Sequence, residues 1–203
     1  MLLNSAQVSR TGYPVAVNAI IQSVESEYRR YQALAEGALA QVPDGALCEA
    51  GPGEGNSLAT IGWHMANNLE SRFTEFLTSD GEKPWRDRED ELSPRVVTRA
   101  ELMAKWERGW KVLLDTLATL SDDDLMKLVK IRGRALPVHE ALHRSLAHAS
   151  YHVGQIVYLA HAKVGAKWSY LSIPPGESDE YNANPRQEGG ADHARKLSGK
   201  PAA

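Results

Sequence analysis

The sequence LAHASYHVGQI, residues 146–156, places two histidines four positions apart in a stretch with the apolar spacing of a buried helix. Pro137 is well placed to begin this helix, which we expect to run to about residue 163. Because four residues are slightly more than one helical turn, His148 and His152 lie about 40° apart on one helix face. Small and apolar residues share that face. The spacing therefore predicts that both imidazoles face the protein interior.

Amphipathic periodicity also marks three other long segments: residues 15–42, 58–77 and 98–120. Ser57 fits the N-cap of the second segment, and Thr98 with Glu101 fits a capping box at the third. Amphipathic helices of this length cannot bury their apolar faces alone, so the sequence predicts an all-α four-helix bundle. The connection between the second and third helices is long enough to cross the bundle. A small hairpin around Gly133 is expected before the last helix.

The length of 203 residues and the composition limit the number of domains that the chain can form. This length suits one domain with a sizeable core, which we assign to residues 1–182. From residue 183 onward the chain is rich in glycine, proline and charge, which predicts a disordered tail over residues 183–203. Because Cys48 is the only cysteine, an intrachain disulfide is excluded, and a reduced, cytoplasmic protein is expected.

Charge and hydropathy exclude two classes of partner. The formal net charge is -3, and lysine and arginine are scattered rather than gathered into a basic stripe, which argues against nucleic-acid binding. The longest uncharged apolar runs are shorter than the roughly 20 residues that a membrane span requires. We therefore expect neither nucleic acid nor membrane as a partner.

A third histidine could complete a metal site with His148 and His152. His64 lies midway along the second helix, at the edge of its apolar face, and Asn68 and Arg72 follow on the same edge. Neighbouring buried imidazoles cost free energy unless each finds a partner, and a divalent metal would supply one. Three imidazoles without a fourth protein ligand are typical of catalytic metal sites. A buried histidine can also be a hydrogen-bonded core residue, and Gln155 could orient one ring.

A rival motif lies one turn earlier in the same helix. HEALH, residues 139–143, matches the H-E-x-x-H pattern of zinc peptidases, in which Glu140 would be the general base. His139 and His143 project from the opposite side of the helix to His148 and His152. No further histidine follows at the spacing of the extended peptidase motif. The peptidase therefore remains the weakest of the functional alternatives.

Four stretches carry a resemblance to a known family: HASYHVGQIVYLA, SLATIGWHMANNLESRF, SIPPGESDEYN and DGEKPWR. Together they resemble the DinB-like four-helix-bundle superfamily, and specifically its DUF1572 branch, over roughly residues 15–182. The resemblance implies a metal-binding bundle with a long crossover between the second and third helices, often as a homodimer. By position it implies that His64, His148 and His152 bind the metal. HEALH is not part of the pattern.

The resemblance also suggests a chemistry, because some members are similar to enzymes that transfer low-molecular-weight thiols to electrophiles. We therefore expect a metal-dependent transferase or hydrolase that activates a thiol or water against a small-molecule substrate. Zinc is the expected metal, with nickel or iron as alternatives. Asn68, Arg72 and Gln155 are the candidate pocket residues, and no general base is assigned. A non-catalytic metal-binding or ligand-sensing bundle is the alternative.

Overall fold

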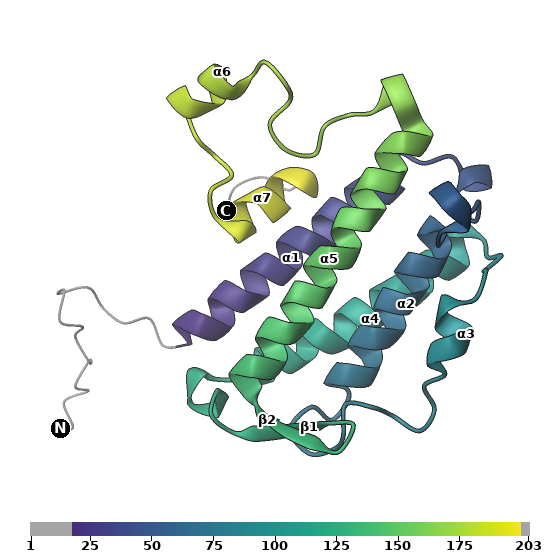
Figure 1. The fold of residues 1–203 in the computed structure, drawn as a ribbon. Coiled ribbons are helices and arrows are strands. Elements are labelled where there is room, and N and C mark those ends of the chain that lie inside the picture. Colours follow the sequence, from purple (N-terminus) through teal and green to yellow (C-terminus); the bar gives the residue numbers. More distant parts are fainter. Residues whose placement is uncertain (1–17, 200–203) are drawn as a thin grey trace.

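The computed structural model describes residues 18–199 as a mostly helical fold (Figure 1). The long helices are α1 (Ala19–Leu39), α2 (Leu58–Phe73), α4 (Arg99–Thr119) and α5 (Val138–Val164). Three shorter helices are α3 (Arg88–Leu92), α6 (Ser178–Ala183) and α7 (Gly190–Leu197). Short 3-10 turns occupy Asp44–Ala46, Pro52–Glu54, Asp122–Asp124 and Gly165–Lys167. Strands β1 (Leu128–Ile131) and β2 (Arg134–Pro137) form an antiparallel hairpin. A mostly helical fold with a small hairpin before the last long helix is thus confirmed.

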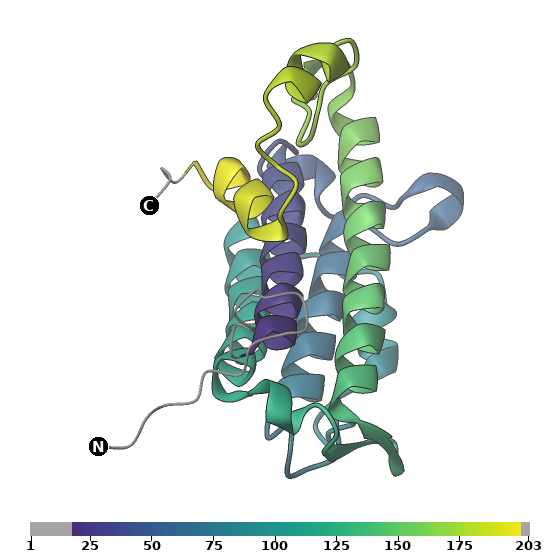
Figure 2. The same cartoon turned by 90° about the vertical axis from the view of Figure 1, so that its left-hand side faces the viewer.

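The four long helices lie alongside one another (Figure 2), with α1 against α5 and α2 against both α4 and α5. Their facing sides build the core from large apolar side chains. Trp106 and Trp110 of α4 are fully buried, and Tyr28 of α1 meets Trp110 edge to face at 6.2 Å between ring centroids. Burial of such aromatic residues contributes strongly to the stability of a helical core.

Helices α2 and α4 run in the same direction. Near their first residues, a Cβ placed on Gly62 of α2 would lie 3.2 Å from a side-chain methyl carbon of Leu102 on α4. At their other ends, Thr116 Oγ1 donates to the carbonyl of Phe73 at 3.0 Å. The connection over residues 74–98 must therefore return along the length of the helices, and it carries α3 against α2 (Figure 1). This placement brings charged residues of the connection next to the α2–α5 contact.

The disordered tail predicted from residue 183 is wrong for residues 190–197, which form α7 on the surface of α1 (Figure 2). His193 is buried, and its Nε2–H donates to the carbonyl of Leu171 at 2.8 Å. A Cβ on Gly190 would lie 2.8 Å from the Ser26 carbonyl oxygen, so glycine permits the close approach. The composition of this segment predicted disorder because it offers no apolar helix face. Helix α7 instead packs on α1 through small and polar residues, of which Gly190 and His193 are buried. The outer parts of the two predicted ranges, residues 1–17 and 200–203, lie outside the described residues.

None of the helices in the described part of the chain combines the length and apolar character needed to cross a membrane.

Candidate metal centre

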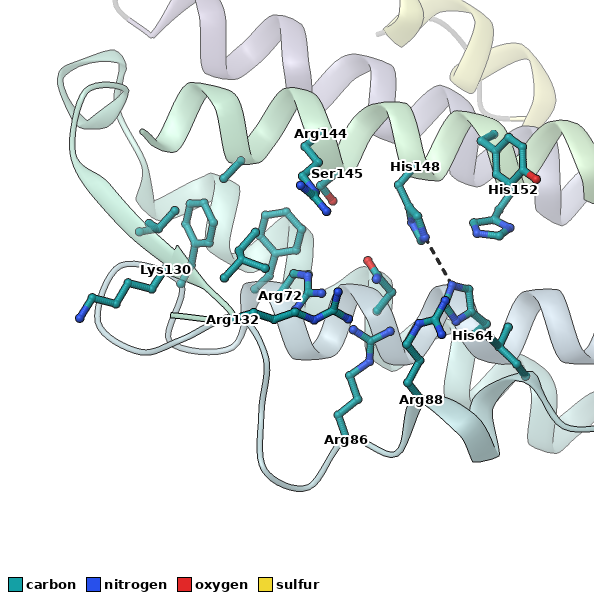
Figure 3. A pocket seen from close by; sticks show the side chains of 18 residues that line it. His64, Arg72, Arg86, Arg88, Lys130, Arg132, Arg144, Ser145, His148 and His152 are labelled. Atoms are coloured by element: carbon teal, nitrogen blue, oxygen red, sulfur yellow. Dashed lines mark hydrogen bonds between the residues drawn. The ribbon is translucent and has the colours of Figure 1, made fainter. Parts of the chain in front are cut away.

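The structure brings the three predicted histidines together between α2 and α5. His64 projects from the middle of α2 toward His148 and His152 on α5 (Figure 3). One ring nitrogen from each residue lies within 4.8 Å of the other two, and His64 Nε2 is 3.3 Å from His148 Nε2. Among residues 18–199, these three side chains are the single group able to hold a metal ion through three ligands. We call them the histidine triad.

Hydrogen bonds on the outer side fix the tautomers of two of these rings. His64 Nδ1 lies 3.0 Å from Glu91 Oε2, and His152 Nδ1 lies 2.7 Å from Gln155 Oε1. A carboxylate and an amide oxygen can only accept, so each Nδ1 carries the proton and donates it. In a neutral ring with its proton on Nδ1, Nε2 keeps a free lone pair. This is the arrangement in which a partner outside the site orients a metal-binding imidazole.

The spacing of the rings suits a small divalent cation. A tetrahedral zinc ion with Zn–N bonds of about 2.0–2.1 Å separates its nitrogen ligands by about 3.3 Å. The separation of 3.3 Å between Nε2 of His64 and Nε2 of His148 matches this value, and the ligand nitrogens of all three residues lie within 4.8 Å of one another. Sequence spacing alone fixed the pair on α5, whereas the contact with His64 spans 84 positions of the chain.

The environment keeps the α5 imidazoles neutral, as metal ligation requires. Burial lowers the pKa of His148 to about 3, with further contributions from the neighbouring His152 and His64. Burial also lowers the pKa of His152, although the hydrogen bond with Gln155 opposes the shift. At neutral pH both rings therefore offer lone pairs rather than positive charge.

Glu91 is the main residue of the site that the sequence analysis missed. It lies on α3 with a side chain only 1% exposed, and Arg86 donates to both of its oxygens at 2.8 Å. Burial alone would raise the pKa of Glu91, but the hydrogen bonds from Arg86 and His64 outweigh burial and hold it below the usual range. Glu91 is one of several acidic residues in an aperiodic segment, so no sequence signal distinguishes it.

A cavity of about 370 Å³ opens beside the histidine triad (Figure 3). Two of the predicted pocket residues, Asn68 and Arg72, line this cavity together with all three histidines. Gln155 does not line it and instead contacts His152 from outside. The cavity also has apolar walls, formed by Phe73, Phe76, Leu92, Val129, Ile131 and Ala141.

The HEALH residues do not form a metal site in the described chain. His139 Nδ1 lies 3.0 Å from the carbonyl of Leu125, so this ring serves a local backbone contact. His143 and Glu140 are exposed, and no third ligand joins the two histidines within residues 18–199. His139, Glu140 and His143 do not line the cavity, and the peptidase hypothesis therefore has no structural support.

Comparisons with known proteins place the chain in a family without assigning an activity. The family model described as "Protein of unknown function (DUF1572)" matches residues 16–177. No curated protein and no solved structure matches the sequence. The match covers α1 to α5 and therefore includes the whole histidine triad and the cavity.

Proposed function

The chain belongs to the DUF1572 family, whose function is unknown, and we propose that it is a metal-dependent enzyme acting on a small molecule in the cavity. In this proposal His64, His148 and His152 bind a divalent transition metal. The reaction is transfer of a low-molecular-weight thiol to an electrophile, or hydrolysis. One observation carries the proposal: three imidazoles converge at the wall of a cavity of about 370 Å³.

The donor set supports zinc as the proposed metal. Three imidazole ligands without a protein carboxylate match the ligands of known catalytic zinc sites, and nickel and iron also accept imidazole. When bound in such a site, a divalent metal lowers the pKa of a thiol or a water molecule so that it can attack at neutral pH. Glu91 accepts a hydrogen bond from the Nδ1–H of His64, which makes Nε2 of the same ring a stronger electron donor to a metal.

The cavity supports a small-molecule substrate. Its volume of about 370 Å³ falls at the lower end of the range for small-molecule sites, roughly 300–1,000 Å³. Phe76 and Val129 supply apolar contact area, while Asn68 offers an amide that can fix the orientation of a polar group. The chain's own contribution is therefore to bind the substrate beside the histidine triad and to limit access of water.

The proposal is tested by metal-dependent turnover. The full chain loaded with zinc would be assayed with glutathione or cysteine and the electrophile 1-chloro-2,4-dinitrobenzene, and separately with nitrophenyl esters. We expect turnover that EDTA abolishes and zinc restores, and that His148→Ala removes. His143→Ala, an exposed histidine on the same helix, is the matched control and should retain full activity. Equal rates for wild type and His148→Ala would contradict the proposal.

A non-catalytic metal site is the second candidate, favoured by the way the triad joins separate segments. His64 lies on α2, His152 lies on α5, and Glu91 ties α3 to the same cluster. A metal in this position would therefore stabilise three elements at once. In that case zinc would raise the melting temperature strongly while none of the substrates above is turned over.

A further inference from the structure

Cationic side chains that the metal proposal does not use line the cavity. Six cationic side chains and no carboxylate are found among the described residues that line it: Arg72, Arg86, Arg88, Lys130, Arg132 and Arg144. They come from α2, the connection with α3, the hairpin and α5, so separate elements converge to form the charged wall. Figure 3 shows the guanidinium groups of Arg72, Arg86 and Arg132 gathered at the same end of the cavity.

Three arginines, Arg72, Arg86 and Arg132, share two carboxylates as side-chain hydrogen-bond partners. Glu82 Oε2 accepts from Arg72 at 3.0 Å and from Arg132 at 2.9 Å, and Glu91 accepts from Arg86. Two carboxylates thus accept from three guanidinium groups, while the nearby Asp80 carboxylate accepts from the backbone N–H groups of Arg132 and Gly133. The pKa of Arg72 is lowered first by burial and then by repulsion from Arg86 and Arg132, although Glu82 opposes the shift. An added anion would relieve this repulsion.

One donor of this cluster also lacks a partner. Arg86 Nη1 is buried in a side chain that is 1% exposed, and no hydrogen-bond acceptor reaches it within the described residues. Glu82 Oε1 lies 3.8 Å away, which is too far for a hydrogen bond. A buried donor without an acceptor costs free energy, and an anionic ligand in the cavity would satisfy it.

We propose that the arginine end of the cavity binds the carboxylate or phosphate of a small amphipathic anion, whose apolar part contacts Phe76 and Val129. Arginine suits this task because its planar guanidinium recognises carboxylate and phosphate through paired hydrogen bonds. The anion would enter with its charged group at the arginines and the remainder directed toward the histidine triad. That the reacting atom lies at the triad rests on the function proposed above, whereas anion binding by the arginines does not require a metal.

The test measures binding to the full chain freed of metal with EDTA, by isothermal titration calorimetry. The probes are hexanoate, hexyl phosphate and the uncharged hexanamide. We expect at least one of the two anions to bind about tenfold or more tightly than hexanamide, because hydrogen bonds between charged groups are stronger than those to a neutral amide. The stronger of the two anions identifies which headgroup the site prefers, and added salt should weaken both.

Two variants separate the cavity arginines from general surface charge. Arg132→Gln combined with Arg144→Gln should weaken anion binding about tenfold or more, because both residues line the cavity. Arg134→Gln is the matched control: Arg134 is exposed on the same hairpin but does not line the cavity, so binding should be unchanged. Both changed arginines of the double variant are exposed, so the fold should be retained.

Several outcomes would overturn the proposal: hexanamide binding as tightly as both anions, neither anion binding, or the double variant binding like wild type. If the anions bind only the zinc-loaded protein, and bind the double variant equally well, then they bind the metal and the arginine site is refuted. Anion binding that persists in metal-free His148→Ala supports the arginine site. Absence of turnover in a protein that binds hexanoate would refute the proposed function while leaving this inference intact.

Discussion

Helix α2 makes two contacts that are built in opposite ways. On the side of α4, a Cβ placed on Gly109 would lie 2.5 Å from the carbonyl oxygen of Ala66 and 2.8 Å from its Cα. The backbones therefore touch, and no space remains for a ligand. On the side of α5, imidazoles separate the helices and a cavity of about 370 Å³ opens. The tight contact fixes α2 in place, so the histidine on its other side is positioned before any ligand binds.

The largest effect is expected on zinc affinity, when a histidine is removed from the contact between α2 and α5. His148→Ala should weaken zinc binding by more than about 100-fold, because losing a direct ligand costs more than losing an orienting partner. The melting temperature of the metal-free protein should not fall, since the α2–α4 contact is untouched. Competition with a chromophoric chelator measures the affinity, and His143→Ala is the control. Equal affinities of the two variants would refute the triad as the metal site.

A change in the tight contact between α2 and α4 should lower the stability of the protein but leave its metal affinity unchanged. Gly109→Ala should lower the free energy of unfolding by about 1–3 kcal/mol, because the new methyl group meets backbone atoms that cannot move aside. Gly154→Ala on α5 is the matched control, since nothing lies within 4 Å of its Cβ position. There alanine should raise the free energy of unfolding by about 0.5–1 kcal/mol. Urea denaturation distinguishes the two, and equal effects would show that α2 and α4 are not in tight contact.

A smaller effect on zinc affinity is expected from Glu91, the hydrogen-bond partner of His64. Glu91→Gln keeps an acceptor for His64 Nδ1 but loses the negative charge, so zinc affinity should fall about tenfold. Glu89→Gln is the control on the same helix, where the Glu89 side chain is 92% exposed. A Glu91→Gln variant with the affinity of wild type would mean that the carboxylate does not act on the metal through His64.

A further effect should appear in the pH dependence of the metal-free protein. The folded pKa of His148 is about 3, whereas an unfolded histidine titrates near about 6.5. Between these values the unfolded chain binds a proton that the native chain does not, so stability rises with pH and is complete near neutral pH. The melting temperature should therefore increase from about pH 4 to 7, and less steeply in His148→Ala. Identical slopes would show that His148 is not held neutral by the fold.

Local spacing was enough to predict the elements that carry the site. Thr98 and Glu101 form the expected capping box at α4, and Ser57 Oγ accepts from the backbone N–H of Thr60 at 3.0 Å at the start of α2. The separation of four residues on α5 likewise placed His148 and His152 together. All of these contacts join residues within about one helical turn, where geometry follows directly from position in the chain.

Contacts between distant segments were beyond such reasoning. The first N–H groups of α1, on Ile20 and Ile21, donate to the carboxylate of Asp122 at 3.0 Å, about one hundred positions away. Arg132 reaches Glu82, and Glu91 reaches His64, across similarly unrelated segments. Among many charged residues, only the packing of the connection and hairpin against α2 selects these partners.

The sequence by itself therefore determined the helices, their starts, and the histidines that face the interior, because periodicity and capping act over three or four residues. Only the tertiary structure decided that Glu91 orients His64, that arginines from separate elements line one cavity, and that α7 lies on α1. The physical reason is that a charge is paired by whatever the fold brings within hydrogen-bond distance, and that distance is set by packing between helices.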